Sequence, residues 1–266
     1  MTTPTITSVS NDLAIALEGH VAVVEIRRPP HNYFDIALIA ALADAFETLE
    51  ADVRCRAIVL AAQGTAFCAG ANFAQREDSA PEQRSPRGIN PLYGEAIRLF
   101  SCVKPVVAAV HGPAVGGGLG LALVADFRVT CAQARFSANF NRLGFHPGFG
   151  LSVTLPRLVG VQQAALLFYT GRRIDGAEAQ RIGLADMLVA QDQVRARAIE
   201  LAQEIAVSAP LAVQSTRATL RTGLVEQIRL AVARESMEQN RQFGTEDFNE
   251  GVAAMAARRP PQFKGR

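Results

Sequence analysis

Cysteine is scarce in this 266-residue sequence, with single residues at positions 55, 68, 102 and 131. None of them forms a CxxC pair, so neither a disulfide framework nor a cysteine-based metal site is indicated. This usage is typical of reduced, buried thiols in a cytosolic protein. We therefore expect four structural cysteines and no metal in the functional site.

An excess of charge of one sign is also lacking, because 27 lysines and arginines stand against 25 acidic residues. Without a field of one sign, neither nucleic acid nor an anionic membrane is expected as a partner. The paired residues Arg27 and Arg28, like Arg258 and Arg259, are then either surface charges or local contacts for phosphate.

Long hydrophobic runs are missing as well. The sequence does not begin with a basic segment followed by an apolar one, and no apolar run is long enough to cross a bilayer. These absences favour a cytoplasmic location. With 49% apolar residues, the chain can still bury a substantial core, as one large domain or two small ones.

Hydrophobic periodicity predicts the first elements. Residues 20–27 are rich in β-branched side chains and are expected to form a hairpin with residues 13–18. Residues 36–49 place apolar side chains at helical spacing, and Asp35 can cap that helix. The chain thus begins with a strand pair followed by a helix.

The same alternation continues along the next hundred residues. Residues 56–62 predict a buried strand, and the polar, proline-punctuated residues 73–90 predict a mobile surface loop. From Pro105 a strand, a glycine-rich turn with a short helix and another strand follow, and a last strand is expected at 185–189. Repeated units of this kind indicate an α/β fold with a parallel sheet and helices outside it.

The C-terminal part of the sequence differs from the rest. Nearly all of it up to Ala257 has helical period, with breaks near Pro210 and Gly244. Helices without a strand among them must bury their apolar faces on the core or on another subunit. We therefore expect a core of residues 1–190 and a helical oligomerisation region of residues 191–266.

Two predicted strands end in glycine-bearing turns, AFCAGANF at 66–73 and HGPAVGGGLG at 111–120. Glycine lets the backbone approach a ligand closely, so that peptide N–H groups can point outward unblocked. Two such groups converging on one point would stabilise the negative oxygen of a thioester enolate or a tetrahedral intermediate. A tight packing junction explains the same spacing, and neither turn matches a phosphate loop or a dinucleotide-binding turn.

Five segments in order and spacing resemble the crotonase superfamily, to which enoyl-CoA hydratases and isomerases belong. These are VAVVEIRRPP, RAIVLAAQGTAFCAGANF, KPVVAAVHGPAVGGGLGLALVADFRV, LGFHPGFGLSVTLPRLVG and TGRRIDGAEAQRIGLAD. The resemblance implies a spiral of strand-strand-helix turns and a C-terminal helical region that forms a homotrimer or a dimer of trimers. It also implies an acyl-CoA substrate, with no cofactor beyond the coenzyme A moiety.

The resemblance further implies an oxyanion hole made by the amides of Ala71 and Gly117. Phe263 and Lys264 are similar to a C-terminal pair that reaches the nucleotide of a neighbouring subunit, although an exposed tail explains them too. Asn72 replaces an acidic residue that is usual after the oxyanion alanine. The residues expected to contact substrate or CoA are Arg27, Arg28, Ala69, Asn72, Phe73, Tyr93, Phe140, Phe263 and Lys264.

The two carboxylates by which the hydratases of this family move protons are missing. The corresponding positions are Gly120 and Phe140, and an aspartate used by isomerases corresponds to Gly148. His146 is a candidate general base, although a lone histidine is more often structural. Tyr93 is similarly either a hydrogen-bond donor or a packing residue. Because loss of a general acid or base costs roughly 10² to 10⁴ in rate, we expect a poor hydratase.

Three functions fit these features: an enzyme acting on acyl-CoA thioesters, a non-catalytic acyl-CoA carrier or sensor, and a structural partner subunit. The intact glycine turns favour the enzyme, which would use Ala71 and Gly117 to stabilise an enolate. Turnover distinguishes the first function from the second, and affinity for CoA distinguishes the second from the third.

Overall fold

The computed structural model describes residues 5–72 and 90–266. Phe73 and the rest of the segment predicted to be a surface loop, up to residue 89, lie outside the described residues.

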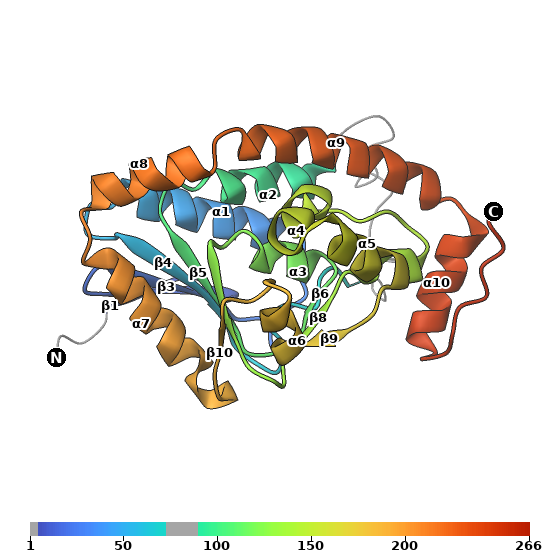
Figure 1. The fold of residues 1–266 in the computed structure, drawn as a ribbon, viewed down its shortest axis with the longest axis horizontal. Helices are drawn as coiled ribbons and strands as arrows, with labels where there is room; N and C mark the ends of the chain where they lie inside the picture. Colours follow the sequence, from blue (N-terminus) through green and yellow to red (C-terminus); the bar gives the residue numbers. More distant parts are fainter. Residues whose placement is uncertain (1–4, 73–89) are drawn as a thin grey trace.

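A mixed seven-stranded sheet forms the centre of the fold, in the order β1-β2-β3-β4-β5-β7-β10 (Figure 1). The first three strands pair antiparallel, which confirms the predicted hairpin, and all pairs from β3 onward are parallel. The strands are β1 Thr5–Ser10, β2 Leu13–Glu18, β3 Val21–Ile26, β4 Ala57–Ala62, β5 Val106–Val110, β7 Phe127–Thr130 and β10 Met187–Leu188.

A second, three-stranded sheet has the order β6-β8-β9. Its strands are short, and none of the three was predicted as such from the sequence. They are β6 Ala114–Val115, β8 Arg135–Ser137 and β9 Ile174–Asp175. Because β6 lies within the second glycine-bearing segment, this small sheet fixes the start of that turn.

Helices cover the main sheet on both sides. Asp35 caps the first of them as predicted, since its Oδ1 accepts the amide of Leu38 at 2.8 Å. Helices α4 and α5 were not predicted, and neither was the break between α8 and α9. The helices are α1 Ile36–Ala51, α2 Pro91–Ser101, α3 Gly117–Ala122, α4 Leu151–Val159, α5 Val161–Thr170, α6 Gly176–Arg181, α7 Val194–Ala206, α8 Pro210–Leu220, α9 Leu224–Gln242 and α10 Glu246–Ala256, with 3₁₀ turns η3 Asn139–Leu143 and η4 Gln191–Gln193.

Each helix packs through its apolar face, and this packing determines the layers of the fold. Helix α7 packs on one face of the sheet against β3, β4, β5 and β7, while α1 covers the other face and α9 lies outside α2 (Figure 1). Strands β3, β4 and β5 are buried along their whole length, which explains their continuous apolar runs. No helix in the described part of the chain is long and apolar enough to span a membrane.

One carboxylate connects the C-terminal helices to the sheet. Oδ2 of Asp126 accepts hydrogen bonds from the amide of Val106 at 2.9 Å and from Nε of Arg217 at 2.8 Å. Its Oδ1 accepts a hydrogen bond from Arg221 at 2.9 Å. Burial and the neighbouring Arg217 lower the pKa of Arg221, so both guanidinium groups depend on this counter-charge. Residues 191–266 are therefore attached to the core by ion pairs as well as by packing, and the proposed division at residue 190 stays a prediction.

Replacing Asp126 with Asn is expected to lower the free energy of unfolding by about 3 kcal/mol, because two largely buried arginines would lose their counter-charge. Chemical denaturation measures this change. Glu178→Gln, which breaks an exposed ion pair with Arg181, is the matched control and should leave stability unchanged. Equal stability of the two variants would contradict the role assigned to Asp126.

Candidate active site

The two glycine-bearing turns lie against each other through their backbones. The amide of Cys68 donates to the carbonyl of Pro113 at 3.0 Å, and the amide of Val115 donates to the carbonyl of Cys68 at 3.0 Å. These bonds form a parallel bridge between Cys68 and Ala114. The first turn is therefore fixed to the strand that leads into the second.

Two glycines permit this close approach. A Cβ placed on Gly118 would lie 2.0 Å from the carbonyl oxygen of Cys68, closer than any side chain can approach. Gly70 has φ +82° and faces the second turn, where a Cβ would lie 2.8 Å from the Val115 oxygen and 3.4 Å from the Gly117 nitrogen. The backbone at residue 70 thus adjoins the amide of Gly117.

The Ala71 amide points away from its neighbouring strand segment. Phe34 forms a parallel bridge with Ala71, and its amide donates to the carbonyl of Gly70 at 3.0 Å. In a parallel bridge, the residue that forms the hydrogen bonds binds the peptide groups before and after its partner residue. The N–H of the partner residue itself therefore points away from that strand segment. Within the described ranges, neither the Ala71 amide nor the Gly117 amide donates a hydrogen bond. Both remain available to a ligand.

The neighbouring Ala69 is different, because its amide donates to the carbonyl of His31 at 3.0 Å. The ring of Phe34 covers Gly117, where a Cβ would lie 2.3 Å from Cζ of that ring. Asn72 is half-buried at the end of the described segment. The predicted roles of Ala69 and Asn72 in binding substrate stay predictions.

A row of polar side chains on α9 holds the turn at residues 146–152. Oε1 of Gln242 accepts the amide of His146 at 2.6 Å, and Nε2 of Gln239 donates to the carbonyl of His146 at 2.9 Å. Glu235 accepts the amides of Gly150 and Ser152 at 2.9 and 3.0 Å. These three side chains fix the backbone path of the turn.

Glu235, Gln239 and Gln242 were not singled out from the sequence. Their spacing of i, i+4 and i+7 places them on one face of the helix, and that pattern was the available signal. Glu235 is fully buried, and burial raises the pKa of its carboxyl group, while hydrogen bonds from Ser152 and Gly150 oppose the rise. Its oxygens are engaged with the turn, so the geometry gives this carboxylate a positioning role.

His146, the candidate base, lies half-buried in this turn. Its Nδ1 is 2.8 Å from the carbonyl oxygen of Pro147, which can only accept, so Nδ1 is the donor of this hydrogen bond. The hydrogen bonds from α9 reach the backbone N–H and carbonyl groups of His146. The structure therefore gives His146 a structural setting, and its role in catalysis stays a prediction.

The positions without carboxylates are occupied by aromatic groups. A Cβ on Gly120 would lie 2.8 Å from Cβ of Phe149, and one on Gly148 would lie 1.9 Å from the hydroxyl of Tyr93. Tyr93 is buried, and its hydroxyl donates to Oε1 of Gln239 at 2.9 Å. Phe140 is also buried and stacks edge-on against Phe145 at 5.4 Å. Restoring a carboxylate at residue 120 or 148 therefore needs more than a single substitution.

Neither predicted arginine is a free cation. Nε of Arg27 donates to Glu25 at 2.8 Å, and Arg28 pairs with Asp12 at 2.8 Å and Asp35 at 2.9 Å. Hydrogen bonds to these two aspartates raise the pKa of Arg28 although burial opposes them. A phosphate would have to compete with these carboxylates, so contact with CoA stays a prediction for both arginines.

The C-terminal tail folds back on α10, at the end of the molecule away from the main sheet (Figure 1). The carboxylate of Asp247 accepts the amides of Lys264 and Gly265 at 2.6 and 2.8 Å. The side chains of Phe263 and Lys264 are exposed. This arrangement presents both outward, and their predicted contact with a neighbouring subunit stays a prediction.

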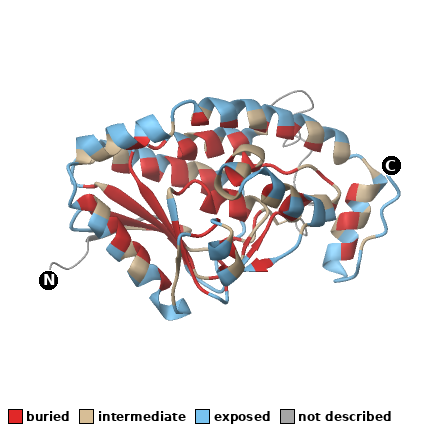
Figure 2. Cartoon of the chain, in the orientation of Figure 1, coloured by how far each residue is buried: buried red, intermediate tan, exposed pale blue. Residues whose placement is uncertain are grey.

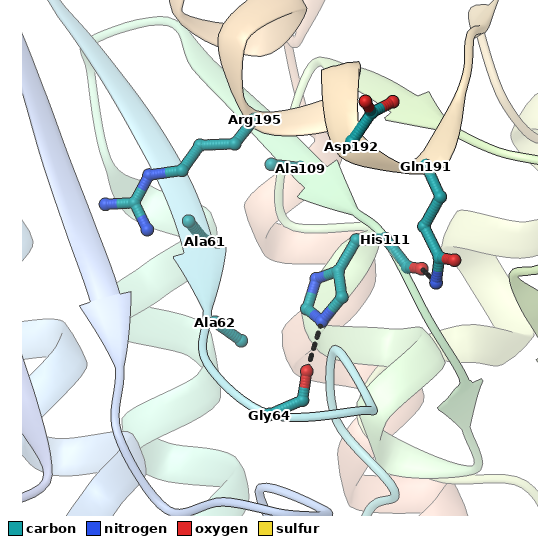
Figure 3. Close-up of a pocket in the computed structure, with 8 residues that line it drawn as sticks. All are labelled: Ala61, Ala62, Gly64, Ala109, His111, Gln191, Asp192 and Arg195. Atoms are coloured by element: carbon teal, nitrogen blue, oxygen red, sulfur yellow. Dashed lines mark hydrogen bonds between the residues drawn. The ribbon is translucent and has the colours of Figure 1, made fainter.

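A pocket of about 230 Å³ lies where β4 and β5 end, on the side of α7 (Figure 3). Nε2 of His111 is 3.0 Å from the Gly64 carbonyl, and Gln191 donates to the His111 carbonyl at 3.0 Å, so His111 connects the starts of the two turns. Arg195 at its rim pairs with buried Glu25. Burial opposes ionisation of Glu25, but Arg195 and Arg27 hold its pKa below the ordinary value. Arg195, one of the two charged residues that line the pocket with Asp192, is therefore already engaged by a carboxylate.

All four cysteines are buried and none forms a disulfide, as predicted. Cys68 lies in the first turn, and its Sγ donates to the carbonyl of Asn32 at 3.1 Å. Burial raises the pKa of its thiol to about 12. Cys68 is therefore protonated at neutral pH and does not supply a thiolate nucleophile.

Comparison with known proteins gives consistent results. The sequence profile of the enoyl-CoA hydratase/isomerase family matches residues 16–266. The chain is 33% identical to the short-chain-enoyl-CoA hydratase of Clostridium acetobutylicum, over 96% of this chain and 99% of that protein. It is 32% identical to the mouse mitochondrial enoyl-CoA hydratase domain-containing protein 2, over 94% and 86%. The crystal structure of an enoyl-CoA hydratase/isomerase from Pseudoalteromonas atlantica superposes with a TM-score of 0.85 at 31% identity, over 95% and 100%.

Gly118→Ala is expected to lower the free energy of unfolding by about 1–3 kcal/mol, because its methyl group would displace the Cys68 carbonyl. Gly94→Ala is the matched control: Gly94 lies on the exposed side of α2 with nothing within 4 Å of an added Cβ. The control should be neutral or stabilising by about 0.5–1 kcal/mol. Thermal and chemical denaturation compare the two, and a stable Gly118→Ala protein would contradict the close approach of the turns.

Proposed function

The chain belongs to the enoyl-CoA hydratase/isomerase family, and we propose that it acts on acyl-CoA thioesters by stabilising an enolate with the amides of Ala71 and Gly117. The observation that carries this proposal is the backbone contact between the two turns. It brings Gly70 next to the nitrogen of Gly117 and leaves both amides without an acceptor among the described residues.

Fixed amide donors suit a reaction in which charge develops on a thioester oxygen. Two donors held by backbone packing need no reorganisation when the enolate forms, and such preorganisation is a large contribution in catalysis. Because the donors are backbone groups, the chemistry itself asks for no particular side chain at residue 71, whereas the ring of Phe34 leaves no room for a side chain at residue 117. Enolate formation is also compatible with the absence of two carboxylates, which hydration in particular requires.

The proposed reaction is therefore thioester chemistry with weak hydration. Gly120 and Phe140, by the resemblance, occupy the places of the hydratase carboxylates, and the first of these places is filled by Phe149. Proton transfer at the enolate carbon is left to another group, for which His146 remains the candidate. The similarity to the short-chain-enoyl-CoA hydratase of Clostridium acetobutylicum supports an acyl-CoA substrate for this chain.

We also propose that the C-terminal helices assemble the protein into a trimer or a dimer of trimers. The outer faces of α8 and α9 are exposed in the single chain (Figure 2). Apolar side chains on and next to these helices are exposed by 64–82%: Val207, Leu211, Leu220 and Leu230. Burying such side chains between subunits would be favourable.

Removing the Ala71 amide tests the catalytic proposal. Ala71→Pro deletes the N–H without breaking a hydrogen bond of the described fold, whereas Ala71→Ser keeps the N–H. We expect the wild type to bind butyryl-CoA and to hydrate crotonyl-CoA slowly. Ala71→Pro should lower kcat a further 10² to 10³-fold, roughly the effect of losing one oxyanion donor, and Ala71→Ser should not.

Isothermal titration calorimetry measures the binding, and the loss of conjugated thioester absorbance measures the hydration. Isomerisation of a 3-enoyl-CoA and exchange of the α-protons of butyryl-CoA in D₂O cover the other enolate reactions. Absence of thioester binding by the folded wild type would contradict the proposed function. Binding without any of the three reactions would favour the carrier instead.

Light scattering after size exclusion tests the assembly, for which we expect a mass of three or six times the 28.4-kDa chain. Leu211→Glu places a charge among the exposed apolar side chains and should shift the protein toward monomer. Val161→Glu, at a position of α5 that is exposed by 74%, is the control. A wild type that stays monomeric at micromolar concentration would contradict the assembly.

A further inference from the structure

Phe149 has an unusual backbone conformation for its size. Its φ is +62°, in the left-handed region that favours glycine, and Gly150 after it has φ +72°. A bulky residue adopts this conformation only when surrounding contacts impose it. The Phe149 side chain is nevertheless 99% buried, so the strain accompanies a defined position of its ring.

The ring lies where a side chain at residue 120 would be. A Cβ built on Gly120 would be 2.8 Å from both Cβ and Cδ1 of Phe149 and 2.9 Å from its Cγ. Its ring centroid is 5.6 Å from that of Phe34, the ring that covers Gly117. One aromatic ring therefore separates Phe149 from the proposed oxyanion donor.

Helix α9 imposes the conformation. Glu235 accepts the amides of Gly150 and Ser152, directly after Phe149, and Gln239 donates to the carbonyl of His146 before it. The turn is thus bound on both sides of Phe149. Buried hydrogen bonds on both sides of a residue can maintain a strained backbone conformation.

The adjacent wall is formed by Tyr93. The Tyr93 hydroxyl occupies the place of a side chain at Gly148, and it donates its proton to Oε1 of Gln239. The bond from Nε2 of Gln239 to the His146 carbonyl fixes which way that amide faces. Tyr93 therefore fills the space at Gly148, the residue before Phe149.

We propose that Phe149 is a specificity-determining residue, which takes the volume of the absent side chain at residue 120 and restricts the site to thioesters with short, apolar acyl groups. The inference rests on the proposed function, because it takes the Gly117 turn as the place where the thioester carbonyl lies. It also explains why a carboxylate cannot simply be reinstated at residue 120.

Affinity for acyl-CoAs of increasing length tests the proposal. Calorimetry with acetyl-, butyryl-, hexanoyl- and octanoyl-CoA is expected to show wild-type affinity that stops rising within this series. Phe149→Gly suits φ +62° and removes the ring, so its affinity should keep rising, by about fourfold for each further methylene that becomes buried. Phe149→Leu should show the same trend with a smaller gain, and it serves if the glycine variant does not fold.

Phe100→Leu is the matched control. Its ring lies 6.3 Å from that of Phe149, on the side of α2, so the substitution opens space in the same cluster without vacating the place next to Gly120. It should lower stability and leave the dependence on chain length as in the wild type. A merely structural Phe149 would behave in the same way as this control.

A double-mutant cycle tests the packing directly. Gly120→Glu should lower Tm in the wild type but much less in the Phe149→Gly or Phe149→Leu background. Equal losses in all backgrounds, or a chain-length profile that no Phe149 variant changes although all bind acyl-CoA, would overturn the inference. Failure of every protein to bind any acyl-CoA would overturn the proposed function, which is a different result.

Discussion

The approach of the Cys68 carbonyl to the Cα of Gly118 is the contact on which the site depends. No side chain fits at residue 118, so the two turns can adjoin only through glycine, and the bridge between Cys68 and Ala114 fixes their register. The positions of Gly70 and the Gly117 amide follow from this contact. The proposed oxyanion donors are therefore positioned by backbone packing, which is rigid and independent of side-chain rotamers.

A second set of contacts connects this backbone arrangement to the far end of the chain. Glu235, Gln239 and Gln242 bind the turn of residues 146–152, and that turn directs Phe149 toward Gly120. Asp126 fixes Arg217 of α8 and the neighbouring Arg221 to the sheet. The C-terminal helices thus help to position Phe149, the residue proposed to limit the acyl group, in addition to the assembly proposed for them.

Sequence patterns predicted the elements whose signals are local. The hairpin of β2 and β3, the Asp35 cap and the buried strand β4 follow from periodicity and capping, and both glycine-bearing turns were located from the glycines that follow predicted strands. The α9 row, the strained Phe149 and the filling of Gly148 by Tyr93 were not predicted. Each of them depends on residues about 30 to 150 positions apart, and a pattern along the chain does not report which distant side chain fills the space above a glycine.

The carbonyl stretch of bound butyryl-CoA, labelled with ¹³C at the thioester carbon and measured by infrared difference spectroscopy, tests the central claim most directly. If the amides of Ala71 and Gly117 donate to the thioester oxygen, the labelled band will move to lower frequency on binding, because hydrogen bonds polarise the carbonyl. A butyryl-CoA that binds with its carbonyl band at the frequency found in water would contradict the account.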